Sequence, residues 1–272
     1  MKKFLLLAGS AILVSTMAMA AAPTAKMKAA VADAGRPADD TKRDENRKPA
    51  EMLAFAGIGP GKVVVDMLPG GGYFTRIFAK AVEPNGRVYA YFGTQYDERL
   101  KSQKKDPDYQ FADLKQTYKN LGVIHGYLPQ LVTPEPVDVV WTSQNYHDMH
   151  NKQYAMDVNE VNKSVFKSLK PGGYYVIIDH KAAESAGDDV TETLHRIKES
   201  TVKKEVEAAG FKLVAEGHDL NYTSDDGTKR VFENDIRGKT NQFMLKFQKP
   251  RPWFSAEELV GGDGIEPPAT SV

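Results

Sequence analysis

One segment, residues 63–75 with the sequence VVVDMLPGGGYFT, restricts the fold of this chain more than any other. Four apolar residues around Asp66 predict a short buried strand, and three consecutive glycines predict a turn from that strand into a helix. Because glycine has no Cβ atom, a ligand can approach the backbone of this turn closely, and the helix beginning near Tyr73 would direct its free N–H groups at it. The segment therefore predicts the floor of a site for a nucleotide-like ligand.

Strand and helix patterns alternate along the rest of the chain. This alternation predicts an α/β fold, in which helices cover both faces of a mostly parallel sheet. In such a sheet a ligand binds beyond the carboxyl ends of the strands, where the strand order reverses. Seven strands are predicted, at residues 62–67, 87–92, 122–125, 137–143, 174–179, 212–217 and 242–247. Helices are predicted from Pro49 and at residues 73–82, 110–121, 154–169 and 193–209, with a Lys-Pro-Gly-Gly turn at 170–173.

Composition excludes several classes of function. The 36 basic and 36 acidic residues balance, so no overall positive field attracts nucleic acid, and we predict no nucleic-acid partner. The chain has no cysteine, which excludes disulfides, thiolate metal sites and a cysteine nucleophile. Any catalysis therefore uses other groups.

The first 20 residues have the pattern of a secretory signal. Lys2 and Lys3 precede an apolar run that reaches about Val14, and small residues end at Ala20. This pattern predicts cleavage near Ala20 and a periplasmic or secreted protein with no stable membrane span afterwards. The alternative is an uncleaved anchor helix, for which the run is short, since a bilayer span needs roughly 20 apolar residues.

The remaining chain divides into three parts by composition. Residues 21–48 are rich in Ala, Lys, Asp and Arg and predict a polar arm with one or two short helices. Residues 49–250 carry the strand and helix pattern and form the predicted main domain. Residues 251–272 have little apolar periodicity and predict a disordered tail. A long polar insertion at 220–239, between the last two strands, is typical of a lid over a substrate site.

A dinucleotide site would need the pattern G-x-G-x-x-G after the first strand. Thr75 stands where the third glycine should fall. The β-rich final pair of strands also differs from the six parallel strands of a dinucleotide-binding fold. Both observations disfavour a nicotinamide-dependent oxidoreductase.

The sequence contains the blocks PAEMLAFAGIGPGKVVVDMLPGGGYFTRIFA, GRVYAY, LKPGGYYVIIDH, EVEAAGF and IRGKTNQFMLKFQKP. In these blocks, which span about residues 43–250, it resembles the class I S-adenosylmethionine-dependent methyltransferases. More narrowly, it resembles a bacterial family of predicted methyltransferases that are often exported. The resemblance implies a Rossmann-like seven-stranded sheet with an antiparallel last strand and S-adenosylmethionine as the cofactor. It also implies methyl transfer to a small or medium-sized small-molecule acceptor, whereas the acceptor itself and the oligomeric state are not predicted.

The resemblance also implies which residues hold the cofactor. Three positions depart from the family pattern: Leu68 replaces the first glycine of the turn, Phe92 the acid that binds ribose, and Tyr127 the acid that faces adenine. The two aromatic rings could pack against adenine, or the Gln-Tyr-Asp sequence at 95–97 could reach the ribose, or affinity could be lost. The predicted cofactor-binding residues are Asp66, Leu68, Gly70, Gly71, Gly72, Phe92, Tyr127 and Asn145.

A dense polar cluster, SQNYHDMH at residues 143–150, follows the fourth strand. The predicted catalytic residues are His147, Tyr146 and Asp148. His147 has a pKa suited to a general base near neutral pH, and Asp148 or Asp179 could orient it. The alternative is a capped helix start with surface histidines.

Two further alternatives remain open. One is metal-assisted transfer, because four histidines lie in segments that should converge above the sheet; we predict no metal, since satisfied polar histidines are commoner than ligands. The other is a non-catalytic periplasmic module that binds a ligand or a partner on the same fold, which the missing ribose acid and the export signal favour. The metal alternative uses His147, His150, His180 and His195 with Asp148 or Asp179.

Charged residues that could line the mouth of the site are Arg43, Asp44, Arg47, Arg230, Asp235 and Arg237, although solvated charges are commoner.

Overall fold

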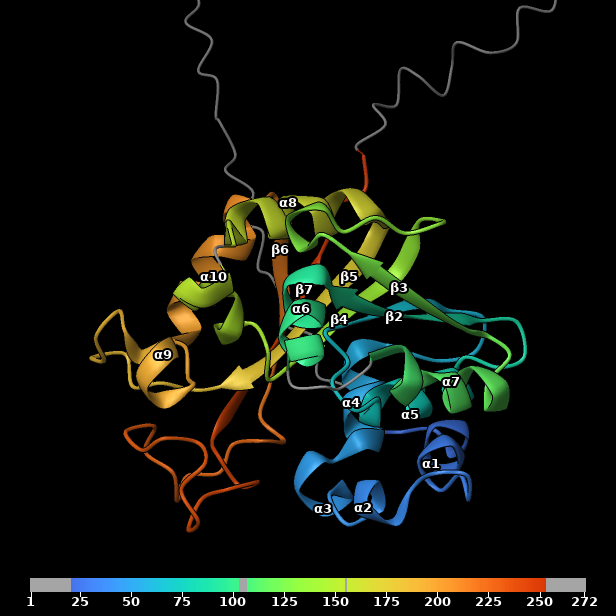
Figure 1. Cartoon of the computed structure of the whole chain (residues 1–272), viewed down its shortest axis with the longest axis horizontal. Coiled ribbons are helices and arrows are strands. Elements are labelled where there is room, and N and C mark those ends of the chain that lie inside the picture. The colour runs from blue at the N-terminus through green and yellow to red at the C-terminus, as the bar shows by residue number, and fades with distance from the viewer. Residues whose placement is uncertain (1–20, 103–106, 155, 253–272) are drawn as a thin grey trace, which may run out of the picture.

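The computed structural model describes residues 21–102, 107–154 and 156–252. Its centre is a seven-stranded sheet in the order β3-β2-β1-β4-β5-β7-β6 (Figure 1). Strands β1 to β5 pair in parallel, and β7 is antiparallel to both β5 and β6. The predicted α/β fold class is therefore confirmed, including the antiparallel last strand. The strands are β1 (Val63–Met67), β2 (Arg87–Gly93), β3 (Leu121–Gly126), β4 (Val137–Ser143), β5 (Leu169–His180), β6 (Lys212–Gly217) and β7 (Gln242–Gln248).

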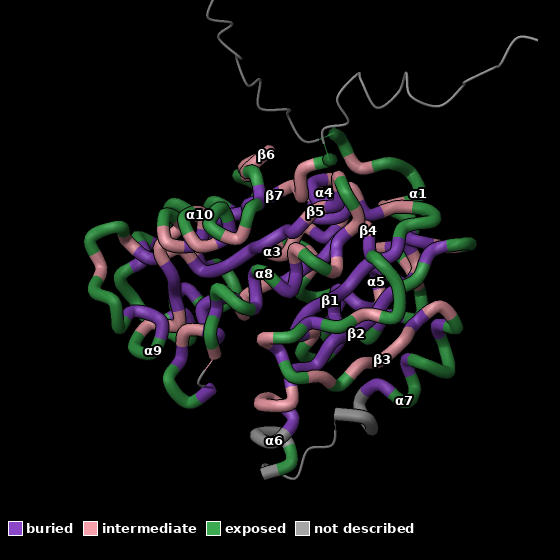
Figure 2. Tube along the Cα trace, turned by 90° about the horizontal axis from the view of Figure 1, so that it is seen from above, coloured by how far each residue is buried: buried purple, intermediate pink, exposed green. Residues whose placement is uncertain are grey.

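Helices cover both faces of the sheet, and the buried strands lie between them (Figure 2). Successive residues of β1 point to opposite faces: Val64 belongs to one apolar cluster and Val65 to the other. None of the described helices has both the length and the apolar character to cross a membrane. The helices are α1 (Ala25–Val31), α2 (Ala38–Thr41), α3 (Asp44–Arg47), α4 (Pro49–Ala56), α5 (Tyr73–Ala81), α6 (Thr94–Ser102), α7 (Pro107–Thr117), α8 (Val158–Ser168), α9 (Val190–Leu194) and α10 (Glu199–Ala208). The 3-10 turns are η1 (Leu128–Gln130), η2 (His147–His150) and η3 (Lys152–Tyr154).

The prediction of a single helix at 193–209 is wrong, because this part of the chain contains the end of α9, a break and α10. The chain leaves the helical conformation at His195, whose φ is 53°, and Ile197 forms a bridge with Lys181 before α10 begins. Arg196 is fully buried, and its guanidinium binds the buried carboxylate of Asp225 at 2.8 Å. The consecutive side chains of Arg196 and Ile197 are both buried in this short segment. These tertiary contacts override the helical pattern of the local sequence.

Two predicted boundaries also change. The helix predicted at 154–169 begins at Val158, because the side chain of Asp157 accepts the N–H groups of the next turn. The turn predicted at 170–173 is an irregularity inside β5, where the pairing with β4 shifts register. The main-chain groups of Gly172 and Gly173 bind Lys249 at 2.9 Å, which keeps this segment in the sheet.

The arm, residues 21–48, forms α1, α2 and α3 and lies against α5. Asp44 accepts two hydrogen bonds from the buried guanidinium of Arg36 and one, at 2.6 Å, from the hydroxyl of Tyr73. Arg76 binds Asp40 at 3.0 Å. Because Tyr73 and Arg76 follow the glycine turn, these bonds place the arm beside that turn. The predicted signal (residues 1–20) and residues 253–272 of the predicted tail lie outside the described residues.

Candidate functional site

The glycine turn after β1 has the backbone shape of a ligand-binding turn. Leu68, Gly70 and Gly72 have φ values of 59°, 54° and 78°. The left-handed conformation at Leu68 is the one that a glycine adopts without strain, so leucine keeps the glycine geometry at this position. A Cβ atom on Gly70 would meet no atom within 4 Å, so there is open space directly above the turn.

Asn145 connects the turns after β1 and β4. Its side-chain amide donates to the carbonyl of Leu68 at 2.9 Å and to that of Ser143 at 2.7 Å. The N–H of Leu68 also donates to the carbonyl of Tyr91 in β2, at 2.9 Å. Neighbouring strands thus hold both main-chain polar groups of the strained residue.

Asp66 is the penultimate residue of β1 and has only 3% of its surface exposed. Burial raises the pKa of this carboxyl to about 7, although the hydroxyl of Thr75, which donates to it at 2.6 Å, and the charge of Arg47 oppose the shift. The carboxyl therefore changes charge near neutral pH. A cationic ligand above the turn would favour its ionised form.

A cavity of about 210 Å³ lies over the turn. Arg47, from the end of α3, is half-buried, and its guanidinium lies 4.4 Å from the ring centre of Tyr73 and 4.9 Å from that of Phe74. Burial lowers its pKa to about 10. Within the described ranges it forms no ion pair with a carboxylate; its hydrogen bond goes to Gln144 at 3.2 Å. The lining residues are Arg43, Arg47, Asp66, Leu68, Pro69, Gly70, Gly71, Tyr73, Phe74, Ser143, Gln144 and Asn145.

A second cavity, of about 520 Å³, adjoins the first between the arm and the insertion (residues 220–239). Figure 1 shows these two segments at the same end of the molecule, and Tyr222 binds the carbonyl of Asn46 at 3.0 Å. Four cations and no carboxylate occur among the described residues that line it. The lining residues are Lys42, Arg43, Asn46, Arg47, Gln144, His180, Val231, Phe232, Arg237, Gly238 and Gln242.

Two buried oxygen atoms without a partner follow the end of β2. Oδ2 of Asp97 lies within hydrogen-bond distance of Nδ1 of His125, at 2.7 Å. The other carboxylate oxygen, Oδ1, has no hydrogen-bond partner in the part of the chain that the structure describes. The same holds for Oε1 of Gln95. Because β1 and β2 are paired in parallel, these atoms lie at the same edge of the sheet as the glycine turn. A donor from water or from a bound ligand would satisfy these two acceptors.

The two aromatic residues predicted to face adenine lie in different surroundings. Phe92 is 4% exposed, stacks on the ring of His125 at 5.2 Å and meets the edge of Phe111 at 5.0 Å. One face of its ring is thus covered by His125, and little of the residue remains exposed. Tyr127 precedes η1 and is 54% exposed.

Of the predicted catalytic residues, the structure brings the side chains of His147 and Asp148 together, whereas that of Tyr146 lies elsewhere. His147 is 3% exposed. Asp179 binds its Nδ1 and its main-chain N–H, both at 2.8 Å, and Asp148 lies 3.5 Å from its Nε2. Burial alone would lower the pKa of His147, but the charges of Asp179 and Asp148 raise it above its usual value. Tyr146 is fully buried, with its hydroxyl bonded to Glu205 and Asn162. Neither His147 nor Tyr146 lines the two cavities described above.

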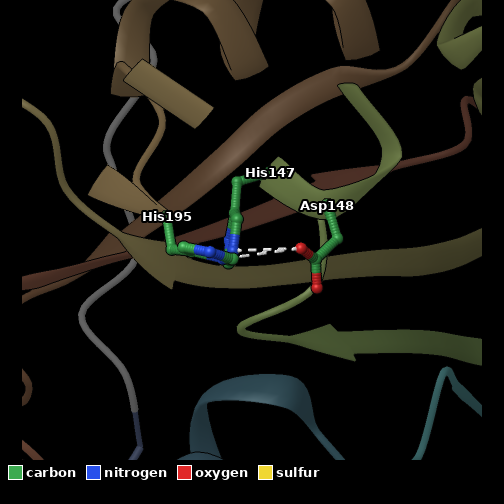
Figure 3. Close-up of side chains that lie close together, drawn as sticks. All are labelled: His147, Asp148 and His195. Carbon is green, nitrogen blue, oxygen red and sulfur yellow. Dashed lines mark ion pairs between the residues drawn. The ribbon is translucent and has the colours of Figure 1, made fainter. Parts of the chain in front are cut away.

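The four histidines expected to converge do so only in part. His195 joins His147 and Asp148, with its Nδ1 3.8 Å from Asp148 (Figure 3). His150 instead pairs with Glu205 at 3.2 Å, and His180 binds Thr240 at 2.7 Å. Burial lowers the pKa of His180 to about 3, so this residue is neutral at physiological pH.

Sequence reasoning missed the unpaired oxygen of Asp97, and it predicted the place of Arg47 only as one of six charged residues that could line the mouth of the site. The structure puts Arg47 in the lining of the cavity over the glycine turn. For Asp97, the one available signal was an acid shortly after the second strand, which the predicted alternatives included.

Comparison with solved structures identifies the class of fold. The chain is similar to an S-adenosylmethionine-dependent methyltransferase from Aquifex aeolicus, with 21% identity, a TM-score of 0.55, and 77% of this chain and 94% of that chain covered. It is also similar to the N-methyltransferase NodS from Bradyrhizobium japonicum (14% identity, TM-score 0.51, 78% and 99% covered). A third similar structure is the [4+2]-cyclase SpnF (15% identity, TM-score 0.54, 81% and 85% covered).

The protein thus has the class I fold of S-adenosylmethionine-dependent methyltransferases. No family model matches the sequence, and no curated protein matches it. At these identities the likeness establishes the fold alone, and the chemistry has to be argued from the site.

Proposed function

We propose that this protein binds S-adenosylmethionine above the β1 turn and transfers its methyl group to a small anionic acceptor. The observation that carries the proposal is the pair of unpartnered acceptors, Asp97 Oδ1 and Gln95 Oε1, at the same edge of the sheet as an open glycine turn. The ribose of the cofactor has two hydroxyl donors, which would satisfy both atoms. Burying these oxygens without donors costs free energy, so a ribose is the kind of group that the site fits.

The methionine part of the cofactor suits the smaller cavity. It has an ammonium, a sulfonium and a carboxylate group, and the cavity offers Asp66 for the cationic groups and Arg47 for the carboxylate. Asn145 and the main chain of Leu68 shape the turn between them. The remaining turn residues in the proposal are Gly70, Gly71 and Gly72, which bring the backbone to the cofactor.

The adenine end of the site has a different composition from the family pattern. We assign the ribose to Asp97 and Gln95, because the ring of Phe92 is covered by His125 and Phe111. Tyr127 has an exposed ring that can close over the outer face of an adenine.

The acceptor belongs in the second cavity. Its charged lining residues are Lys42, Arg43, Arg47 and Arg237, and its described lining contains no carboxylate, so a carboxylate or phosphate group would be favoured there. The two cavities share Arg43, Arg47 and Gln144, so an acceptor in the second cavity would lie next to the methyl donor in the first. Holding both molecules in line is itself a large part of catalysis.

Titration calorimetry tests the cofactor assignment. We expect the protein to bind S-adenosylmethionine and S-adenosylhomocysteine but not NAD. Asp97→Ala should weaken binding roughly 10- to 100-fold, since a hydrogen bond to a charged group contributes about 1.5–3 kcal/mol. The matched control is Asp113→Ala, an exposed acid on α7. Absence of heat with all three ligands would reject the proposal and favour a non-catalytic binding module.

We also propose that the protein is exported and that residues 1–20 are removed. The support is the pattern of two lysines, an apolar run and small residues ending at Ala20. Cell fractionation and sequencing of the mature N-terminus test it, and a cytoplasmic protein that retains Met1 would contradict it.

A further inference from the structure

We propose that His147, Asp148 and His195 form a binding site for a divalent transition metal, with Zn²⁺ as the best fit. The three side chains come from two segments, η2 and the break between α9 and α10, and point toward one another (Figure 3). The inference uses only the geometry of these residues and does not depend on methyl transfer.

The spacing of the ligand atoms matches a metal centre. Oδ1 of Asp148 lies 3.5 Å from Nε2 of His147 and 3.8 Å from Nδ1 of His195, and one ligand atom from each residue lies within 4.8 Å of the others. Zinc bonds of about 2.0–2.2 Å in tetrahedral geometry place neighbouring ligand atoms roughly 3.3 Å apart. Small side-chain rotations therefore bring the three atoms to coordination distance.

Asp179 orients the ring of His147 and fixes its tautomer for metal binding. It is fully buried and binds the Nδ1 of His147 at 2.8 Å, and it also accepts the main-chain N–H groups of His147 and His180. A proton held on Nδ1 leaves the lone pair on Nε2, which is the atom facing Asp148. Metal-binding histidines characteristically have such an outer carboxylate, which fixes the tautomer and the ring orientation.

The backbone at His195 is also specialised. Its φ of 53° lies in the left-handed region, which few residues other than glycine adopt, although histidine, asparagine and aspartate do so more often than the rest. Non-glycine residues in this region cluster at functional sites. The next residue, Arg196, is anchored by Asp225 at 2.8 Å and by the carbonyl of Lys229 at 2.7 Å. These buried contacts hold the strained residue where its ring meets His147, at a centroid distance of 5.6 Å.

One of the three proposed ligands, His195, borders a cavity from which a further ligand could approach. His195 lines a cavity of about 300 Å³ together with Asn151, Lys152, Gln153 and Glu192. Three protein ligands leave a coordination position for water or another molecule, as in catalytic zinc sites. Imidazole ligands favour transition metals over Mg²⁺ and Ca²⁺. Two neutral imidazoles and one carboxylate leave a divalent ion with a net positive charge, which favours an anion over a neutral molecule at the fourth position.

Metal analysis of the purified protein tests the site. We expect one Zn²⁺ per chain after dialysis, and visible absorption bands when Co²⁺ replaces it. His195→Gly removes a ligand while suiting the left-handed backbone, and should weaken binding by more than the roughly 10- to 100-fold expected for the outer variant Asp179→Asn. His150→Ala is the matched control, because His150 pairs with Glu205 outside the cluster and should bind metal as the wild type does.

Two results would overturn the inference. One is a wild-type protein that holds no stoichiometric zinc or cobalt. The other is His195→Gly binding metal as tightly as His150→Ala, which would place the ion elsewhere. Thermal unfolding with a chelator present checks that each variant is folded. Cofactor titration is a separate measurement, so loss of S-adenosylmethionine binding would leave the metal result intact.

A metal on Nε2 also occupies the lone pair that His147 would need as a general base.

Discussion

Asn145 donates its side-chain amide to the carbonyl of Leu68 at 2.9 Å and so joins the turn after β4 to the turn after β1. Leu68 has a left-handed backbone, which costs a residue with a Cβ atom about 1–2 kcal/mol. The hydrogen bond opposes that cost by fixing the carbonyl in the position the strained conformation requires. The shape of the cofactor turn therefore depends on a contact 77 residues away in the chain.

Removing this contact should affect both stability and binding. Asn145→Ala is expected to lower the free energy of unfolding by about 1–3 kcal/mol, because the Leu68 carbonyl loses a buried donor. It should also weaken S-adenosylmethionine binding, since the turn can relax. Urea denaturation and calorimetry measure the two effects. Asn159→Ala, at an exposed position of α8, is the control, and equal behaviour of the two variants would contradict the role of Asn145.

Asp66 should make stability and binding depend on pH. Burial raises its folded-state pKa from 3.8 to about 7, so between about pH 4 and 7 the folded state binds more protons than the unfolded state. This contribution to stability is present at low pH and is lost as pH rises through 7. As the pH rises from 5 to 8, the free energy of unfolding of Asp66→Asn should therefore increase by a few kcal/mol relative to that of the wild type, since one pKa unit corresponds to about 1.4 kcal/mol.

The titration of Asp66 should change cofactor affinity in the direction opposite to stability: affinity should rise with pH, whereas stability falls. Wild-type affinity for S-adenosylmethionine is expected to rise between pH 6 and 8, roughly across the pKa of Asp66, because the ionised carboxylate attracts the cation. The Asn variant should bind weakly and lack this rise. Urea denaturation and calorimetry across this pH range provide both measurements, and identical pH profiles for the two proteins would refute the assignment.

Adding a methyl group at Gly70 should block the cofactor. Gly70→Ala meets no protein atom within 4 Å, so its structural cost is limited to the left-handed backbone, about 1–2 kcal/mol. Its Cβ enters the space assigned to the ligand, and affinity should fall at least tenfold by calorimetry. Gly61→Ala is a matched control with φ of 76° and equally open surroundings outside the lining of either cavity. If both variants bind alike, the cofactor lies elsewhere.

Arg47 should recognise the carboxylate of the cofactor. Arg47→Gln is expected to weaken S-adenosylmethionine binding about tenfold or more, since a hydrogen-bonded charge pair contributes about 1.5–3 kcal/mol. Binding of 5′-methylthioadenosine, which lacks the amino-acid part, should be unchanged. The exposed Arg230→Gln, outside the lining of either cavity, is the comparison. An equal loss for both ligands would show that Arg47 acts only through packing on Tyr73 and Phe74.

Much of the fold could be predicted because its signals are local. The run of four apolar residues around Asp66 forms β1 as expected, and the glycines after it form the turn into α5. The 193–209 segment shows the limit of this reasoning: its pattern is helical, but the buried ion pair between Arg196 and Asp225 breaks it. A local pattern contains no information about a partner 29 residues away.

The sequence by itself determined the succession of the seven strands along the chain, the glycine turn and the residues that follow the ends of β1 and β4. Those features depend on apolar periodicity and on the conformational freedom of glycine, both of which are local properties. Only the tertiary structure decided that Arg47 lies over the turn, that Asp97 has an unpaired oxygen, and that His195 meets His147 beside Asp179. Each of these depends on which distant segments the packed core brings together, and burial then sets the charge and hydrogen-bonding state of the groups that meet.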